Sequence, residues 1–225
     1  MTGVQTCALP IFTRTAPRTD SALGPFRSSA SAHAVREAIE TVVPLRRCST
    51  RVGRRAPLAD GAPCLPAQLG VATCPCRGHA DEDEYADLVA TVLRGLGPDP
   101  DALCRPLAER MHRLAADERF EEAALTRDRL DALTAAVARR RALERLRSAG
   151  EIVVDGPDGA LVVRDGGVVL PDEPLTGDPH DDEVLLVARW LDRNAARTRV
   201  RSATGTFASV LPKLPDYRAS GAGAP

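Results

Sequence analysis

The sequence has few aromatic residues and no long apolar run. Phe, Trp and Tyr together make up 3% of its 225 residues, and the formal net charge is -1 at pH 7. So few rings argue against a single large core built on aromatic side chains. No apolar stretch reaches eighteen residues, so we expect no transmembrane helix. The length leaves room for one domain or for two small ones.

The N-terminus lacks the parts of a signal peptide. Residues 1–12 have neither a basic n-region nor an adequate apolar segment. Residues 1–11 resemble instead the conceptual translation of a common sequencing adapter, so we interpret them as an artefact and expect no function for Cys7. On this interpretation the gene extends upstream of Thr13, and the chain is the C-terminal fragment of a longer protein.

Residues 103–146 predict two antiparallel helices, because apolar side chains recur every three or four residues on each side of a short polar break at residues 116–119. The apolar positions are Leu103, Leu107, Met111 and Leu114, then Phe120, Ala123, Ala124, Leu130, Leu133 and Val137. An isolated hairpin buries too little apolar area to offset its ordering entropy. Its apolar stripe therefore needs a partner, either elsewhere in this chain, in a second copy or in another protein.

The residues of this hairpin resemble the UVR motif, which the bacterial excision-repair proteins UvrB and UvrC share. The resemblance lies in Met111 and in residues 115–116, 120–124 and 127–130, with Thr126 where leucine is usual. In that family the motif pairs the two proteins through matching hairpins. The resemblance implies docking onto a UvrB-like partner through Met111, Phe120, Ala123, Ala124, Leu125, Arg127, Asp128 and Leu130.

The segment before the hairpin also resembles UvrC. Residues 24–26, 29–30 and 35–37 are similar to the segment that follows the GIY-YIG nuclease domain in that family, and we expect a helix from Ser31 as N-cap to the stop at Pro44. The resemblance covers residues 24–146 and points to Cho-like or actinobacterial exonuclease–GIY-YIG relatives. The sequence has no GIY and YIG pair and no triad of spaced carboxylates. We therefore expect catalytic residues upstream, not in this chain.

Four cysteines lie in a loop-like region rich in Pro, Gly and Arg, namely Cys48, Cys64, Cys74 and Cys76. Four thiolates in a segment with little local core can hold a metal, and the alternative is free thiols. The UvrC resemblance implies an iron–sulfur cluster, with zinc as the other option. Ala72 stands where the third family cysteine is usual, and a single proline separates Cys74 from Cys76, which is a tight spacing for two ligands.

The same loop carries five arginines, Arg46, Arg47, Arg51, Arg54 and Arg55. Clustered cations of this kind can contact DNA phosphates. A solvated loop with nearby acids as counterions explains them equally well. No aromatic residue interleaves them, so base stacking is not supported.

The remaining patterns predict one more helix before the hairpin and a mixed tail after it. Acidic residues 81–84 suit the first turn of a helix. From Glu151 onward, short β-type runs alternate with Asp-Gly turns, then residues 181–195 predict a helix and residues 200–210 one or two strands. The expected fold is mainly α with a small α+β tail. We divide the chain into residues 1–23 (artefactual or disordered), 24–80, 81–150, 151–215 and 216–225 (disordered).

Taken together, the residues and the resemblance predict a non-catalytic portion of a cytoplasmic DNA-repair nuclease that contacts a UvrB-like protein and DNA and no membrane. Two alternatives remain open. The first is a UVR-motif adaptor that binds a kinase or a chaperone, although such adaptors have regular Cys-x-x-Cys pairs that this chain lacks. The second is a DNA-binding module that acts through its arginines alone.

Overall fold

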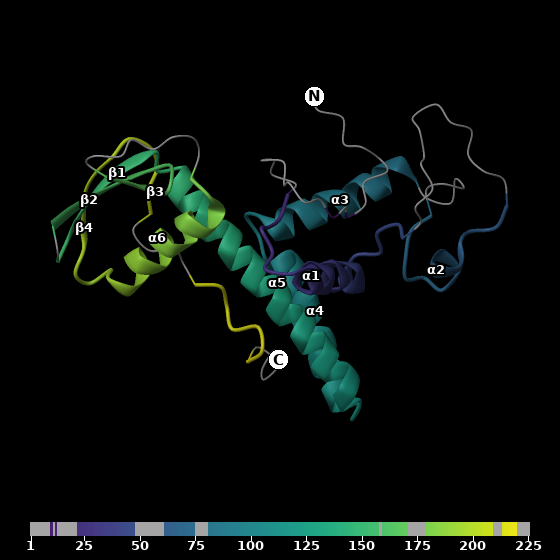
Figure 1. The fold of residues 1–225 in the computed structure, drawn as a ribbon. Helices are drawn as coiled ribbons and strands as arrows, with labels where there is room; N and C mark the ends of the chain where they lie inside the picture. Colours follow the sequence, from purple (N-terminus) through teal and green to yellow (C-terminus); the bar gives the residue numbers. More distant parts are fainter. Residues whose placement is uncertain are drawn as a thin grey trace. The chain divides into compact units, whose positions relative to one another are not determined.

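The computed structural model describes residues 10, 12, 22–47, 61–74, 81–157, 159–170, 179–208 and 213–219. Within these ranges it contains six α-helices and a four-stranded antiparallel sheet (Figure 1), which confirms the expected fold class. The helices are α1 (Ser29–Val42), α2 (Leu65–Gln68), α3 (Glu82–Leu96), α4 (Asp101–Ala116), α5 (Phe120–Arg147) and α6 (Asp181–Arg193). The strands are β1 (Glu151–Gly156), β2 (Gly159–Arg164), β3 (Gly167–Val169) and β4 (Arg199–Ala203).

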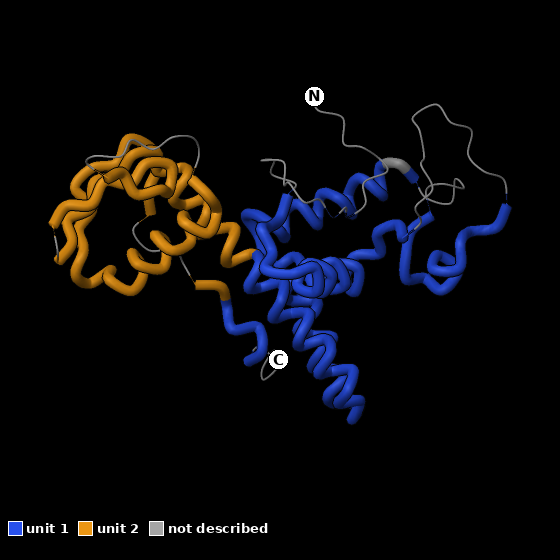
Figure 2. The backbone as a smooth tube through the Cα atoms, in the orientation of Figure 1, with its two compact units in different colours: residues 1–136, 215–225 blue, residues 137–214 orange. Residues whose placement is uncertain are grey.

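The chain forms two compact units (Figure 2). Unit 1 comprises residues 1–136 and 215–225, and unit 2 comprises residues 137–214. The boundary lies inside α5, so one continuous helix contributes its first part to unit 1 and its last part to unit 2. The chain returns to unit 1 after residue 214, so the polypeptide connects the units twice. The domain limits that we expected from the sequence stay a prediction.

Unit 1 is a helical assembly in which α1 and α3 both pack against α4. Ser28, not Ser31, caps α1, because Ser28 has extended backbone angles and its Oγ accepts from the N–H of Ser31 at 3.2 Å. The helices α3 and α4 approach each other closely at Gly95. A Cβ atom there would lie 2.4 Å from Cγ of Leu103, so only glycine fits.

A turn of three residues joins α4 to α5. Helix α4 ends at Ala116 and α5 begins at Phe120, which agrees with the expected polar break to within one residue. Glu118 has a φ of 58°, and the N–H of Arg119 donates to the carbonyl of Leu114 at 2.9 Å. This left-handed residue and closing hydrogen bond end α4 sharply.

Unit 2 is a sheet of order β3-β2-β1-β4 with α6 and the end of α5 packed against one face. Alternate strand residues point into this layer, as the period of a half-buried strand requires. The buried residues are Leu143, Leu146, Ala149, Ile152, Val154, Val163, Val184, Leu185, Val187, Ala188 and Leu191. Gly166, in the turn between β2 and β3, has a φ of +92°, and a Cβ atom there would lie 2.6 Å from Cγ1 of Val184, so only glycine fits.

Among the residues that the structure describes, no helix combines the length and the apolar character needed to span a bilayer.

Candidate functional site

The tip of the hairpin exposes two large apolar side chains of α5. Phe120 is 66% exposed and Leu125 is 59% exposed. Ala124 lies one helical turn after Phe120 on the same row and is half-buried. The last two residues of α4, Ala115 and Ala116, are exposed beside the turn. We call these five residues the docking tip.

Charged side chains surround the docking tip and pair with one another. Arg119 donates to both carboxylate oxygens of Glu122 at 2.6 Å, and Arg127 donates to Asp128 at 2.7 Å. The hydrogen bond from Arg119 holds the pKa of the Glu122 carboxyl below its ordinary value. Because all four side chains are about half exposed, these pairs add little stability. An apolar centre with a polar rim is the usual anatomy of a protein interface.

Three of the eight predicted docking residues are buried inside unit 1. Met111 is 9% exposed, Ala123 is 8% and Leu130 is 1%. These side chains stabilise the hairpin and its neighbours, so they cannot all contact a partner directly. The predicted set therefore falls into two groups. Met111, Ala123 and Leu130 are buried, and Phe120, Leu125, Arg127 and Asp128 are exposed, while Ala124 is half-buried.

Thr126 occupies the position where the family usually has leucine. It is 2% exposed, and its hydroxyl donates to the carbonyl of Glu122 at 2.8 Å within α5. The hydroxyl group is thus hydrogen-bonded within the helix itself. Threonine at this position therefore leaves no unpaired hydroxyl group in the hairpin.

Two of the four predicted metal ligands lie in described parts of the chain. Cys74 is 1% exposed, whereas Cys64 is half-buried and immediately precedes α2. Thr73 donates to the carbonyl of Pro44 through both its N–H, at 2.9 Å, and its hydroxyl, at 2.5 Å. These bonds bring Cys74 beside the segment that leads to Cys48.

Cys48 and Cys76 lie outside the described residues. Within the described residues, no group of three or more His, Cys, Asp or Glu side chains is arranged as a metal site. The metal therefore stays a prediction.

Two of the five predicted DNA-contacting arginines are described, and both are engaged within unit 1. Arg46 is 4% exposed, and its backbone N–H donates to the hydroxyl of Tyr85 at 3.2 Å. Arg47 donates to the carbonyl of Glu40 at 3.0 Å and also approaches its carboxylate. Arg51, Arg54 and Arg55 lie outside the described residues, so the DNA-contacting role of the set stays a prediction.

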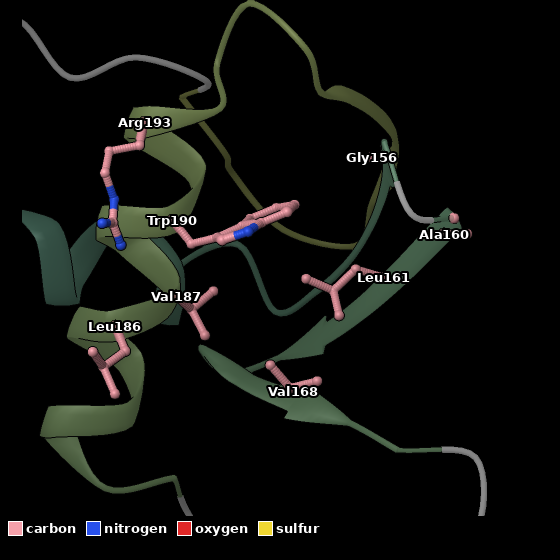
Figure 3. A pocket seen from close by; sticks show the side chains of 9 residues that line it. Gly156, Ala160, Leu161, Val168, Leu186, Val187, Trp190 and Arg193 are labelled. Carbon is pink, nitrogen blue, oxygen red and sulfur yellow. The ribbon is translucent and has the colours of Figure 1, made fainter.

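Unit 2 contains a pocket of about 500 Å³ that the sequence did not indicate (Figure 3). Trp190 and Val187 reach into it from α6, and Leu161 and Val168 reach into it from the strands, while Arg193 points away. The lining residues are Gly156, Gly159, Ala160, Leu161, Val168, Leu186, Val187, Trp190 and Arg193. A mostly apolar lining can take an apolar group but offers no nucleophile, so we assign it no chemistry.

Comparison with known families identifies both halves of unit 1. The model of the UvrC/Cho excinuclease middle domain matches residues 4–95, and the UvrB/uvrC motif matches residues 102–135. The second match covers α4 and the first part of α5, which is the hairpin described above. The chain belongs to the UvrC family, of which it carries the middle domain and the UVR motif, and the recognition made from its residues is confirmed.

Curated relatives agree with this assignment. UvrABC system protein C of Natronomonas pharaonis is 28% identical over 90% of this chain and 33% of its own length. The protein of the same name from Desulforudis audaxviator is 32% identical over 84% of this chain and 36% of its own length. A protein of Mycobacterium tuberculosis named as a bifunctional exonuclease/endonuclease is 28% identical over 81% of this chain and 33% of its own length.

The chain thus spans about a third of the length of these relatives. No solved structure matches it. The middle-domain match begins inside residues 1–11. Our interpretation of those residues as an artefact stays a prediction, which the genomic sequence upstream of Thr13 has to test.

Proposed function

We propose that this chain is a non-catalytic region of a UvrC/Cho-like nucleotide-excision-repair endonuclease and that it docks onto UvrB through the docking tip. The observation that carries the proposal is that the matched motif and the exposed apolar side chains lie on the same hairpin. The UvrB/uvrC motif match covers the α4–α5 hairpin, and Phe120 and Leu125 are exposed at the end of that hairpin. In the complete protein, docking would place the nuclease domains beside the damaged DNA.

The physical basis is burial of apolar surface that the free chain leaves in water. Each square ångström of apolar surface removed from water contributes roughly 25 cal/mol. A phenylalanine at the centre of an interface, surrounded by polar groups that exclude water, is the kind of residue that dominates binding energy. The polar rim around Phe120, with cations and carboxylates in alternation, would select a partner hairpin of complementary charge.

The test is a calorimetric titration of this chain with purified UvrB. We expect Phe120→Ala to weaken binding by about 2–4 kcal/mol, or roughly 30- to 1000-fold in Kd, because it removes the largest exposed side chain of the tip. Leu125→Ala should have a smaller effect in the same direction. Leu186→Ala is the matched control, because Leu186 is an equally exposed leucine of unit 2, at 60%. An unchanged Kd for Phe120→Ala would contradict the docking assignment.

We further propose that Cys48, Cys64, Cys74 and Cys76 hold an iron–sulfur cluster or a zinc ion. Thiolates are the ligands that both groups prefer, and such a centre would cross-link a segment with little apolar core. The bonds from Thr73 to Pro44 support this proposal, because they hold Cys74 beside the segment that leads to Cys48. Iron, zinc and labile sulfide measured after anaerobic purification test it, with Cys104→Ser as a control that should retain the metal. Metal far below one equivalent would contradict it.

The remaining arginines, Arg51, Arg54 and Arg55, are the proposed DNA contacts. Affinity for duplex DNA should then fall with rising salt, because cations that neutralise phosphates release counterions. Substituting these three residues by alanine should reduce the slope of this salt dependence. Repeating the titration with UvrB present separates direct DNA contact from contact through the partner. A salt slope equal to that of the wild type would show that these arginines do not contact phosphates.

A further inference from the structure

The C-terminal segment returns to the hairpin at the end opposite the docking tip. Tyr217 is 4% exposed, and its hydroxyl donates to Oδ1 of Asp101 in the first turn of α4 at 2.5 Å. The next residue, Arg218, donates to Asp131 in α5 through its Nε at 2.8 Å and also through Nη2. Two consecutive residues of the segment thus bind carboxylates on the two different helices of the hairpin.

A local turn presents both side chains. The N–H of Tyr217 donates to the carbonyl of Pro215 at 3.0 Å, and the carboxylate of Asp216 accepts from the N–H of Arg218 at 3.1 Å. Aspartate closing a turn on the backbone two residues later is a common device for fixing chain direction. The segment is therefore pre-shaped for the two carboxylates.

These contacts lie at the end of the hairpin opposite the docking tip. Residues 117–119 join α4 to α5 at the docking tip. Asp131 lies eleven residues after Phe120, or about 16 Å along α5 at 1.5 Å per residue, and Asp101 begins α4. The segment therefore fastens the end of the hairpin where the chain itself makes no turn, and it leaves Phe120 and Leu125 exposed.

The Tyr217 contact is the stronger of the two. Its phenol is buried and donates to a charged acceptor, which makes hydrogen bonds about twice as strong as neutral pairs. The Arg218–Asp131 pair is more exposed, at 58% and 36% for the two side chains, so its bidentate geometry fixes direction more than it stabilises. Arg105 donates to the second oxygen of Asp101, so both oxygens of this carboxylate accept a hydrogen bond.

From these contacts we propose that Asp101 and Asp131 form a binding site for a tyrosine–arginine segment. The chain's own residues 217–218 fill this site and clamp α4 to α5. We call this set of four residues the clamp. Its role is to fasten α4 to α5 at the end of the hairpin that has no turn and to keep Cys104 covered. The inference rests on the chain alone and not on the proposed partner.

Cys104 supplies a reporter of the clamp. It lies one helical turn after Asp101, is 0% exposed, and its electrostatic neighbours include Tyr217. Burial raises the pKa of its thiol to about 12, so the closed form should react slowly with alkylating reagents. Opening of the clamp should uncover this thiol.

The experiment measures the alkylation rate of Cys104 by peptide-resolved mass spectrometry in the full chain. Tyr217→Phe keeps the ring and removes the donor, and we expect about a tenfold faster rate. Arg218→Asp should also raise the rate, and the exchanged pair Arg218→Asp with Asp131→Arg should restore it. Arg201→Asp is the matched control, because Arg201 is an exposed arginine paired with Asp155 in unit 2.

Amide exchange at Leu130 and Leu133, measured on the same samples, separates clamp opening from unfolding of unit 1. Both leucines are buried in α5, so their exchange should stay unchanged when only the clamp opens. An unchanged alkylation rate in both Tyr217→Phe and Arg218→Asp would overturn the proposal. A parallel rise in exchange at the two leucines would also overturn it, and so would failure of the exchanged pair to restore the rate. None of these three results bears on the docking tip.

Discussion

The two ends of α5 carry similar apolar side chains but differ in what covers them. Near its start, Phe120 and Leu125 are largely exposed, whereas Leu143 and Leu146 near its end are 4% and 0% exposed. The end of the helix is followed by a sheet and by α6, which supply a covering layer in unit 2. At the start, the described chain supplies only a three-residue turn. Phe120 and Leu125 therefore stay in contact with water, whereas Leu143 and Leu146 belong to the core of unit 2.

Charged residues show the same contrast. Arg145, near the end of α5, has a side chain only 1% exposed, donates to Asp192 at 2.8 Å, and lies 5.9 Å from the centre of the Phe207 ring. Arg127, near the start, is half exposed and pairs with its sequence neighbour Asp128. Burial makes the first pair structural, while solvent screening leaves the second one able to exchange partners.

The largest expected effect comes from shortening one leucine at each end of the helix. Leu146→Ala should lower the free energy of unfolding by about 2–5 kcal/mol, because it leaves a cavity in the unit 2 core. Leu125→Ala should change it by less than about 0.5 kcal/mol, because that side chain already meets water. Urea unfolding followed by circular dichroism and by the fluorescence of Trp190, the sole tryptophan, measures both. Equal losses would show that the docking tip is covered in solution.

The next effect concerns the buried arginine. Asp192→Ala should destabilise unit 2 by about 2 kcal/mol, below the range for a fully buried pair because Asp192 is itself 56% exposed. Arg145 would then keep its hydrogen bond to the carbonyl of Ala188, at 3.4 Å, and its contact with the Phe207 ring. Asp182→Ala is the control, because Asp182 is 86% exposed and pairs with Arg139 at the surface. Equal urea unfolding midpoints for the two variants, measured by Trp190 fluorescence, would contradict the structural role of the Arg145–Asp192 pair.

The smallest effect is a pH dependence at the clamp. The Tyr217 hydroxyl, and then Arg105, hold the pKa of Asp101 below its ordinary value of 3.8. A carboxyl whose pKa is lower in the folded state stabilises the fold fully above pH 3.8, and this contribution is lost as the pH falls through the folded value. The stability difference between wild type and Asp101→Asn should therefore shrink below pH 3.8. A difference that does not shrink at all below pH 3.8 would exclude this linkage.

The hydroxyl group of Tyr217, which pairs with Asp101, should make stability depend on pH in the alkaline range as well. Burial and the bond to Asp101 raise the pKa of Tyr217 above its ordinary 10.0. Its contribution is therefore complete below pH 10 and is lost as the pH rises through the folded value. Urea midpoints of wild type and Tyr217→Phe between pH 8 and pH 11 measure it, and their difference should be constant below pH 10 and begin to shrink above it.

Much of this architecture was predictable because it depends on neighbouring residues. The apolar period and the polar break predicted the hairpin, and the Asp-Gly turns predicted the small sheet, both of which the structure confirms. The cap of α1 was placed three residues late, at Ser31, because Ser28 also satisfies the pattern and only backbone angles distinguish them. The sequence predicted eight docking residues as one set, because periodicity alone does not show which apolar side chains are already buried within the chain.

The sequence by itself determined the helices, their breaks and the family, because hydrogen bonds between residues three or four apart and residue pattern suffice for these. Tertiary structure alone decided that Arg46 is buried against Tyr85, 39 residues away, and that Tyr217 reaches Asp101 across 116 residues. Contacts of that separation leave no periodic trace in the chain. They exist because apolar faces pack first and bring distant polar groups within bonding distance.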